Sequence, residues 1–196
     1  MCIRDRGMMS LVTDIKEDAE WLIRMVENIL TVTRISEETG TISKTPEAAE
    51  EIISEAVMKF RRRYDVPVEI TIPDELMLIP MDAILIEQVI VNLLENSVLH
   101  GKTTTLIKLT LSSDGENAVF SVTDNGSGIN EKKLPMLFSG YFIHAEEQSG
   151  DVKRNMGIGL SVCLTIIKAH GGTMTAGNLP EGGAEFTFTL PLERAL

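Results

Sequence analysis

The stretch QVIVNLLENSVLHG, residues 88–101, combines the apolar spacing of an amphipathic helix with two amides in the middle of its stripe. Asn92 and Asn96 lie one helical turn apart and share this stripe with Val89. A buried amide without a hydrogen-bond partner costs about 1–3 kcal/mol, so two neighbouring amides need a role beyond core packing. The stretch predicts a core helix over residues 83–100 with one functional side.

Length and composition limit the classes of protein to which the chain can belong. With 196 residues, 43% of them hydrophobic and 24% charged, it can form one domain with a packed core and an appendage. A net charge of -11 and a pI near 4.8 argue against a nucleic-acid binder but leave anionic small ligands open, because backbone dipoles and metals act locally. Two cysteines, Cys2 and Cys163, are too few for a disulfide framework and fit a reducing compartment.

The first part of the chain differs in character from the rest. Residues 1–9 have no apolar period, so they are expected to be either disordered or an artefactual end foreign to the fold. Residues 10–38 carry a heptad-like apolar seam and predict one long helix. The seam includes Leu11, Ile15, Leu22, Met25 and Ile29. A narrow seam cannot bury itself, so this helix is expected to need a partner, either a second copy or an upstream helix.

Beyond a polar hinge, the chain from residue 42 to 196 predicts an α+β domain. Helices are predicted over residues 48–60, 83–100, 131–138 and 158–170. Strands are predicted over residues 66–73, 75–80, 104–113, 117–124, 172–178 and 184–191. The pattern is typical of a two-layer α/β sandwich, in which three helices cover one face of a mixed, mostly antiparallel sheet.

Two glycine-bearing stretches accompany the asparagine pair. VTDNGSGI, residues 122–129, ends a predicted strand, and KRNMGIGLSVC, residues 153–163, leads into a predicted helix. Glycines ahead of a helix let backbone N–H groups approach an anion, which the helix dipole also favours. Each stretch alone is common in proteins, but their order and separation within one α+β domain are far more specific.

Together these stretches resemble the ATP-binding domain of sensor histidine kinases, which belongs to the Bergerat-fold group with gyrase-type and Hsp90-type ATPases. The N box of that family corresponds to residues 92–97, its first glycine box to 124–129, its F box to 137–142 and its second glycine box to 157–161. The ending HGGTMTAGNLPEGGAEFTFTLP is similar to potassium-responsive sensor kinases. Residues 10–38 resemble the second helix of the dimerisation hairpin of these kinases.

The resemblance implies a set of nucleotide-binding residues. Asn96 would be the protein ligand of Mg²⁺, and Asn92 would hold the phosphates or a metal-bound water, so both would be catalytic. Asp124 would accept a hydrogen bond from the adenine amine. Residues 143–156 would form a lid. The remaining contacts to ATP would come from Gly126, Gly128, Ile129, Tyr141, Lys153, Arg154, Gly157, Gly159 and Leu160.

The resemblance also implies an activity and partners. The intact protein would be a homodimeric histidine kinase that passes the γ-phosphoryl group of ATP to a histidine and then to a response-regulator receiver domain. The domain would be cytoplasmic, with any anchor in the inner membrane lying upstream. None of His100, His144 and His170 stands in an acceptor-histidine motif, and His170 is expected to interact with the dipole at the end of its helix.

Three positions depart from the pattern of the family, and two other functions remain open. Leu99 and Ile143 replace a frequent lysine and arginine, and Asn155 replaces a frequent glycine. One alternative is an ATP-binding regulatory module without catalysis. The other is a Bergerat-fold ATPase, which is disfavoured because Asn92 stands where such enzymes place a general-base glutamate. The upstream coding sequence distinguishes the kinase from the module, since only the kinase requires an acceptor histidine there.

Overall fold

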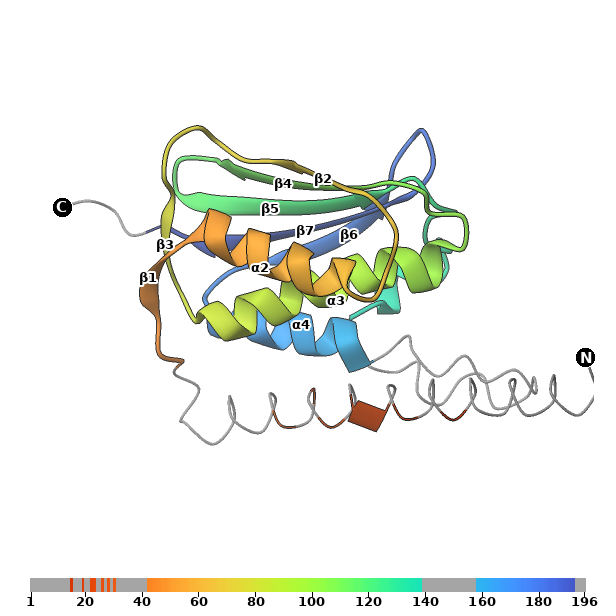
Figure 1. Cartoon of the computed structure of the whole chain (residues 1–196), viewed down its shortest axis with the longest axis horizontal. Helices are drawn as coiled ribbons and strands as arrows, with labels where there is room; N and C mark the ends of the chain where they lie inside the picture. The colour runs from red at the N-terminus through yellow and green to blue at the C-terminus, as the bar shows by residue number, and fades with distance from the viewer. Residues whose placement is uncertain are drawn as a thin grey trace, which may run out of the picture.

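The computed structural model describes residues 42–138 and 158–192, together with residues 15, 19, 22, 23, 26, 28 and 30 of the N-terminal helix. In Figure 1 a five-stranded sheet lies above three helices, which confirms the predicted α+β sandwich. The helices are α2 (Ala49–Arg61), α3 (Ala83–Gly101) and α4 (Ile158–Ala169). The sheet has the order β2 (Val68–Thr71), β4 (Ile107–Ser113), β5 (Asn117–Asp124), β7 (Ala184–Pro191) and β6 (Met174–Asn178).

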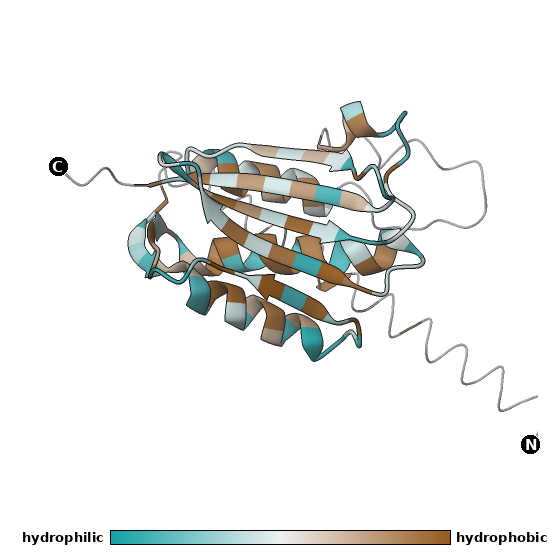
Figure 2. Cartoon of the chain, turned by 90° about the horizontal axis from the view of Figure 1, so that it is seen from above, coloured by the Kyte–Doolittle hydropathy of each residue, from teal (hydrophilic) through white to brown (hydrophobic). Residues whose placement is uncertain are grey.

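The sheet buries the face that lies on the helices. Strand β5 alternates between partly exposed and buried residues, and its buried positions are Ala118, Phe120, Val122 and Asp124. The Phe120 ring stacks on Phe188 of β7 with 4.5 Å between centroids, in the middle of the core. Seen from above, the strands carry alternating hydrophobic and hydrophilic bands (Figure 2). Asp124 is therefore a carboxylate in the last inward-facing position of an otherwise apolar row.

Helix α3 forms the centre of the helical layer. The carboxylate of Asp82 caps its first turn by accepting hydrogen bonds from the backbone N–H groups of Ile84 and Leu85, both at 3.1 Å. Its core face includes Leu93 and Leu94, which are fully buried. Among the helices that the structure describes, only α3 is long and apolar enough to cross a membrane, and it packs between α2, α4 and the sheet.

A small second sheet was missed in the sequence. Residues predicted to be a hinge contain β1 (Thr45–Ala48), which pairs antiparallel with β3 (Leu78–Met81). As a result β3 does not join the main sheet. The sequence TPEA gives no strand signal of its own, because it contains a proline and no alternation of apolar and polar side chains. The domain boundary near residue 42 stays a prediction.

The predicted helix over residues 131–138 is wrong. The structure has only a 3₁₀ turn, η1 (Leu134–Met136). The Asn130 side chain accepts a hydrogen bond from the Lys132 N–H at 2.9 Å, which favours a turn, and Pro135 has no N–H to extend a helix. The remaining predicted elements of the described part of the chain are present, although the strands predicted at 66–73, 104–113 and 172–178 are each shorter and the one predicted at 75–80 is shorter and shifted to Leu78–Met81.

His170, just after α4, connects the end of this helix to the residue before α3 and to Lys44. Its ring Nε2 accepts a hydrogen bond from the Asp82 N–H at 3.0 Å, while Nδ1 lies 2.8 Å from the Ile166 carbonyl. Burial lowers the pKa of His170, so the ring is neutral with its proton on Nδ1. The Nδ1–H group facing the Ile166 carbonyl agrees with the expected interaction of His170 with the end of its helix. The Lys44 ammonium adds a cation at this end by donating to the His170 carbonyl at 2.8 Å.

The pKa of His170 predicts how stability depends on pH. Because the pKa is lower in the folded than in the unfolded chain, the unfolded state takes up the proton first as the pH falls below about 6.5. The stability that the neutral ring contributes is thus present above this pH and is lost below it. In His170→Gln we expect the slope of the free energy of unfolding between pH 7 and 5 to decrease, by up to about 1.4 kcal/mol per pH unit. Urea unfolding at several pH values measures this, and identical slopes would contradict it.

Candidate functional site

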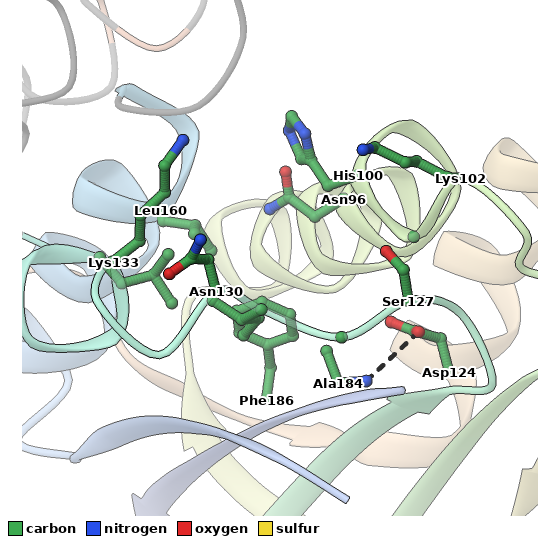
Figure 3. Close-up of a pocket in the computed structure, with 14 residues that line it drawn as sticks. Asn96, His100, Lys102, Asp124, Ser127, Asn130, Lys133, Leu160, Ala184 and Phe186 are labelled. Atoms are coloured by element: carbon green, nitrogen blue, oxygen red, sulfur yellow. Dashed lines mark hydrogen bonds between the residues drawn. The ribbon is translucent and has the colours of Figure 1, made fainter. Parts of the chain in front are cut away.

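A cavity of about 390 Å³ opens beside the C-terminal half of α3, between the loop after β5, the start of α4 and the start of β7 (Figure 3). Its lining combines polar and charged side chains with apolar ones. The lining residues are Asn96, His100, Gly101, Lys102, Asp124, Ser127, Gly128, Ile129, Asn130, Lys133, Leu137, Leu160, Ala184 and Phe186. A pocket of this size with a few convergent polar groups is typical of a small-molecule site.

Asp124 is the fixed acceptor of the cavity. Its side chain is buried, and its Oδ1 accepts hydrogen bonds from the backbone N–H groups of Gly126 at 2.9 Å and Ala184 at 3.3 Å. Both N–H groups therefore bind the same oxygen. The bond from Ala184 is the dashed line in Figure 3. The carboxylate is therefore held in one orientation and can offer Oδ2 to a donor group of a ligand.

Asn96 brings an amide from α3 to the same cavity. Its Nδ2 is buried and has no hydrogen-bond partner in the part of the chain that the structure describes. An unsatisfied amide costs about 1–3 kcal/mol, which a polar ligand in the cavity would remove. The described residues contain no cluster of three acidic, histidine or cysteine side chains that could hold a metal. A cation here would thus take one ligand from Asn96 and the rest from a bound molecule and water, as Mg²⁺ commonly does.

The loop that follows Asp124 is held against α3. The amide oxygen of Asn125 accepts from the Thr105 and Leu106 N–H groups at 2.9 and 3.1 Å. A Cβ on Gly126 would lie 2.6 Å from the Gly101 carbonyl oxygen, so only glycine fits there. Gly126 therefore packs the loop on the end of the helix and does not itself line the cavity.

The structure gathers some of the predicted site residues and not others. Asn96, Asp124, Gly128, Ile129 and Leu160 line the cavity. Asn92, expected to face the ligand with Asn96, instead places its Nδ2 3.7 Å from Cys163 Sγ, between α3 and α4. Gly159 lies in the first turn of α4, where an added Cβ would meet no described atom within 4 Å. The predicted contacts Tyr141, Lys153, Arg154 and Gly157, and the departures Ile143 and Asn155, lie outside the described residues.

Several lining residues were not predicted from the sequence. Ala184 and Phe186 occupy alternate inward-facing positions of β7, so strand alternation could have placed them on the same face as Asp124. Lys102 and Lys133 add two cations to the upper rim of the cavity in Figure 3, in a chain that is acidic overall. Lys102 has a φ of 55°, which is uncommon for a residue with a side chain and marks the sharp end of α3.

Comparison with known proteins places this geometry in a class. The catalytic domain of the histidine kinase ThkA superposes with a TM-score of 0.64 and 26% identity, over 77% of this chain and 97% of that one. The full-length kinase ShkA, solved in complex with AMPPNP, gives a TM-score of 0.67 and 25% identity, over 95% of this chain and 39% of that one. The chain therefore has the fold of histidine kinase catalytic domains.

Sequence relationships identify the family. The chain belongs to the histidine kinase-, DNA gyrase B- and HSP90-like ATPases, whose family pattern matches residues 81–194, and it carries the ATP-binding catalytic domain of a sensor histidine kinase. The sensor protein KdpD of Clostridium acetobutylicum is 36% identical over 192 residues, which are 97% of this chain and 21% of that protein. The chain thus spans about a fifth of the length of this curated relative.

The contact between Asn92 and Cys163 leads to a prediction about thiol reactivity. Burial raises the pKa of the Cys163 thiol to about 12, so almost none of it is thiolate at pH 8. In a Cys2→Ser background we expect no reaction of the native protein with Ellman's reagent at pH 8, and one thiol per chain after denaturation in guanidinium. Labelling of the native variant at the rate of a free cysteine would contradict the packing of α4 on α3.

Proposed function

We propose that this domain binds Mg·ATP in the cavity and that the intact protein transfers the γ-phosphoryl group to a histidine, from which a response-regulator aspartate receives it. The observation that carries the proposal is the Asp124 carboxylate, held on one oxygen at the floor of a cavity whose opposite side bears Asn96. The complex of the related kinase ShkA with AMPPNP supports the choice of an adenine nucleotide.

The chemistry of Asp124 favours adenine over guanine. A carboxylate only accepts hydrogen bonds, so it pairs with the exocyclic amine of adenine. Guanine has a carbonyl oxygen at that position and would repel the carboxylate. Apolar side chains of Ile129, Leu160 and Phe186 line the same cavity and would bury the faces of the base.

The phosphates would lie toward the start of α4 and the rim lysines. The first turn of an α-helix carries backbone N–H groups without partners inside the helix and lies at the positive end of its dipole, and α4 begins at Ile158 beside the cavity. Lys133 lies above Leu160 at this side of the cavity in Figure 3. Mg²⁺, held by the Asn96 amide oxygen and by phosphate oxygens, would neutralise charge that develops on the transferred group. Lys153, Arg154 and Gly157 remain predicted phosphate contacts, and Asn92 a predicted contact to phosphate or metal-bound water.

The proposed partners and location follow from the same function. The intact kinase would form a homodimer through the N-terminal helix and would dock a receiver domain. Among the described cysteines, Cys163 is a free thiol, which fits a domain in the reducing cytoplasm. An anchor in the inner membrane would belong to an upstream segment.

Replacement of Asp124 tests the base selectivity. Asp124→Asn keeps an oxygen for the Gly126 and Ala184 N–H groups but turns an NH₂ donor toward the adenine amine. We expect the affinity for Mg·ATP to fall about tenfold or more, since hydrogen bonds to charged groups contribute about 1.5–3 kcal/mol, and the affinity for Mg·GTP to fall less. Titration calorimetry measures both. Asp114→Asn is the matched control, because the Asp114 carboxylate also accepts backbone N–H groups, in the β4–β5 turn. Equal wild-type affinity for the two nucleotides would refute the assignment.

Replacement of Asn96 tests the metal site. In Asn96→Ala we expect ATP to bind several-fold more weakly in Mg²⁺, because the only protein ligand proposed for the cation is lost. With EDTA in place of Mg²⁺, variant and wild type should bind ATP with similar affinity. Ser97→Ala, next to it but directed at the Leu93 carbonyl inside α3, serves as the control. An equal loss for Asn96→Ala with and without Mg²⁺ would show that Asn96 does not hold the metal.

Replacement of the apolar helix side chains tests dimerisation. Ile15, Leu22 and Val26 lie at spacings of seven and four and are 60%, 53% and 54% exposed. Burying each would contribute about 1.5–3 kcal/mol, so we expect the full chain to self-associate as its concentration rises. The double variant Leu22→Glu, Val26→Glu should stay monomeric in sedimentation velocity. Ile84→Glu, which alters a residue 76% exposed on α3, should associate like the wild type. A wild-type chain that is monomeric at all concentrations would contradict this role.

A further inference from the structure

Asn178, the last residue of β6, binds both backbone groups of Ile129 with its side chain. Its Oδ1 accepts from the Ile129 N–H at 2.6 Å, and its Nδ2 donates to the Ile129 carbonyl at 2.7 Å. The two residues are 49 positions apart in the sequence. The pairing also fixes the orientation of the amide, since a backbone N–H can only donate and a carbonyl can only accept. The Asn178 side chain thus replaces a neighbouring strand for one residue of the loop.

The same residue stands beside the group that holds Asp124. In the β6–β7 ladder Asn178 pairs with Ala184, whose backbone N–H donates to Asp124 Oδ1. Gly183, just before it, has a φ of 95°, and a Cβ there would overlap the Asp124 carbonyl. The end of the β6–β7 hairpin therefore contacts Asp124 on one side of the cavity and Ile129 on another, and we call the side formed by Ile129 the Ile129 wall.

The loop is shaped to receive this side chain. Gly128 has a φ of 71°, and a Cβ on it would lie 2.8 Å from Asn178 Oδ1. Glycine is needed here both for the left-handed backbone and for the approach of the amide. The other end of the loop is fixed by Asn125, which accepts from the N–H groups of Thr105 and Leu106 just before β4. The Ser127 N–H also holds it by donating to the Gly101 carbonyl at 2.9 Å. Among these contacts only those of Asn178 hold the loop beyond Gly128.

We propose that Asn178 is a positioning residue for the nucleotide base: it sets the distance between the Ile129 wall and Asp124, and so holds the adenine amine opposite the carboxylate. This inference rests on the proposed binding of ATP. Asn178 does not line the cavity and acts only through Ile129 and Ala184. Without it, the phosphates would still bind, but the base would be held less firmly against its acceptor.

The experiment compares ATP and GTP binding to the full chain in wild type, Asn178→Ala and Asn178→Ser. The serine is too short to bridge both backbone groups of Ile129. Loss of two hydrogen bonds to the loop should lower the affinity for Mg·ATP about two- to tenfold and change that for Mg·GTP less, so that the ATP-to-GTP ratio falls. The exchange rate of the Ile129 amide hydrogen, measured by NMR, should rise in both variants. Asn117→Ala, at the opposite end of β5, is the matched control and should change neither quantity.

The outcomes separate the inference from the proposed function. A wild-type chain that binds no Mg·ATP would overturn both. Wild-type binding with an unchanged ATP-to-GTP ratio in Asn178→Ala and Asn178→Ser would overturn the inference alone, even where the melting temperature falls, because a merely structural role lowers stability without changing selectivity. A lower ratio in both variants, with a normal ratio in Asn117→Ala, supports the positioning role.

Discussion

The pairing of one carboxylate oxygen with two backbone N–H groups organises the site. Asp124 ends the central strand, and its Oδ1 joins the loop at Gly126 to the start of β7 at Ala184. A buried carboxylate is costly unless its lone pairs are satisfied, and here the backbone of two separate segments satisfies one oxygen. Their positions are thereby fixed around the acidic group, and the second oxygen remains for the ligand. The carboxylate of Asp124 can stand at the end of the row of buried apolar side chains on β5 because this end of the strand lines the cavity.

Helix α3 combines a core face with a polar side. Leu93 and Leu94 are fully buried against the sheet and the neighbouring helices, whereas Asn96 reaches the cavity. The rigid packing of the first face fixes the position of the second, since a helix locks residues one turn apart. The helix is tied to α2 by the Lys59–Glu87 ion pair and to the turn after α2 by the Arg63–Glu95 ion pair. The amide therefore stands on a support that does not depend on the ligand.

The sequence predicted the local features well and the long-range ones poorly. The spacing in residues 88–101 located α3, and the turn glycines located the loop that carries Gly128 and Ile129 to the cavity. The contacts of Ala184 and Asn178 could not be inferred, because they depend on which strands pair. Strand β1 was missed for the same reason, since the residues that pair with it lie 30 to 36 positions further along the chain. No helix forms at 131–138 because the Asn130 side chain and Pro135 favour a turn.

The central claim is that the base of ATP binds on Asp124 while the metal binds on Asn96. A crystal structure of the chain with Mg²⁺ and a non-hydrolysable ATP analogue tests it most directly. The account predicts the adenine amine within hydrogen-bonding distance, about 3 Å, of Asp124 Oδ2, and a cation bound by the Asn96 amide oxygen and by phosphate oxygens. A nucleotide bound outside this cavity, or a base whose amine points away from Asp124, would contradict it.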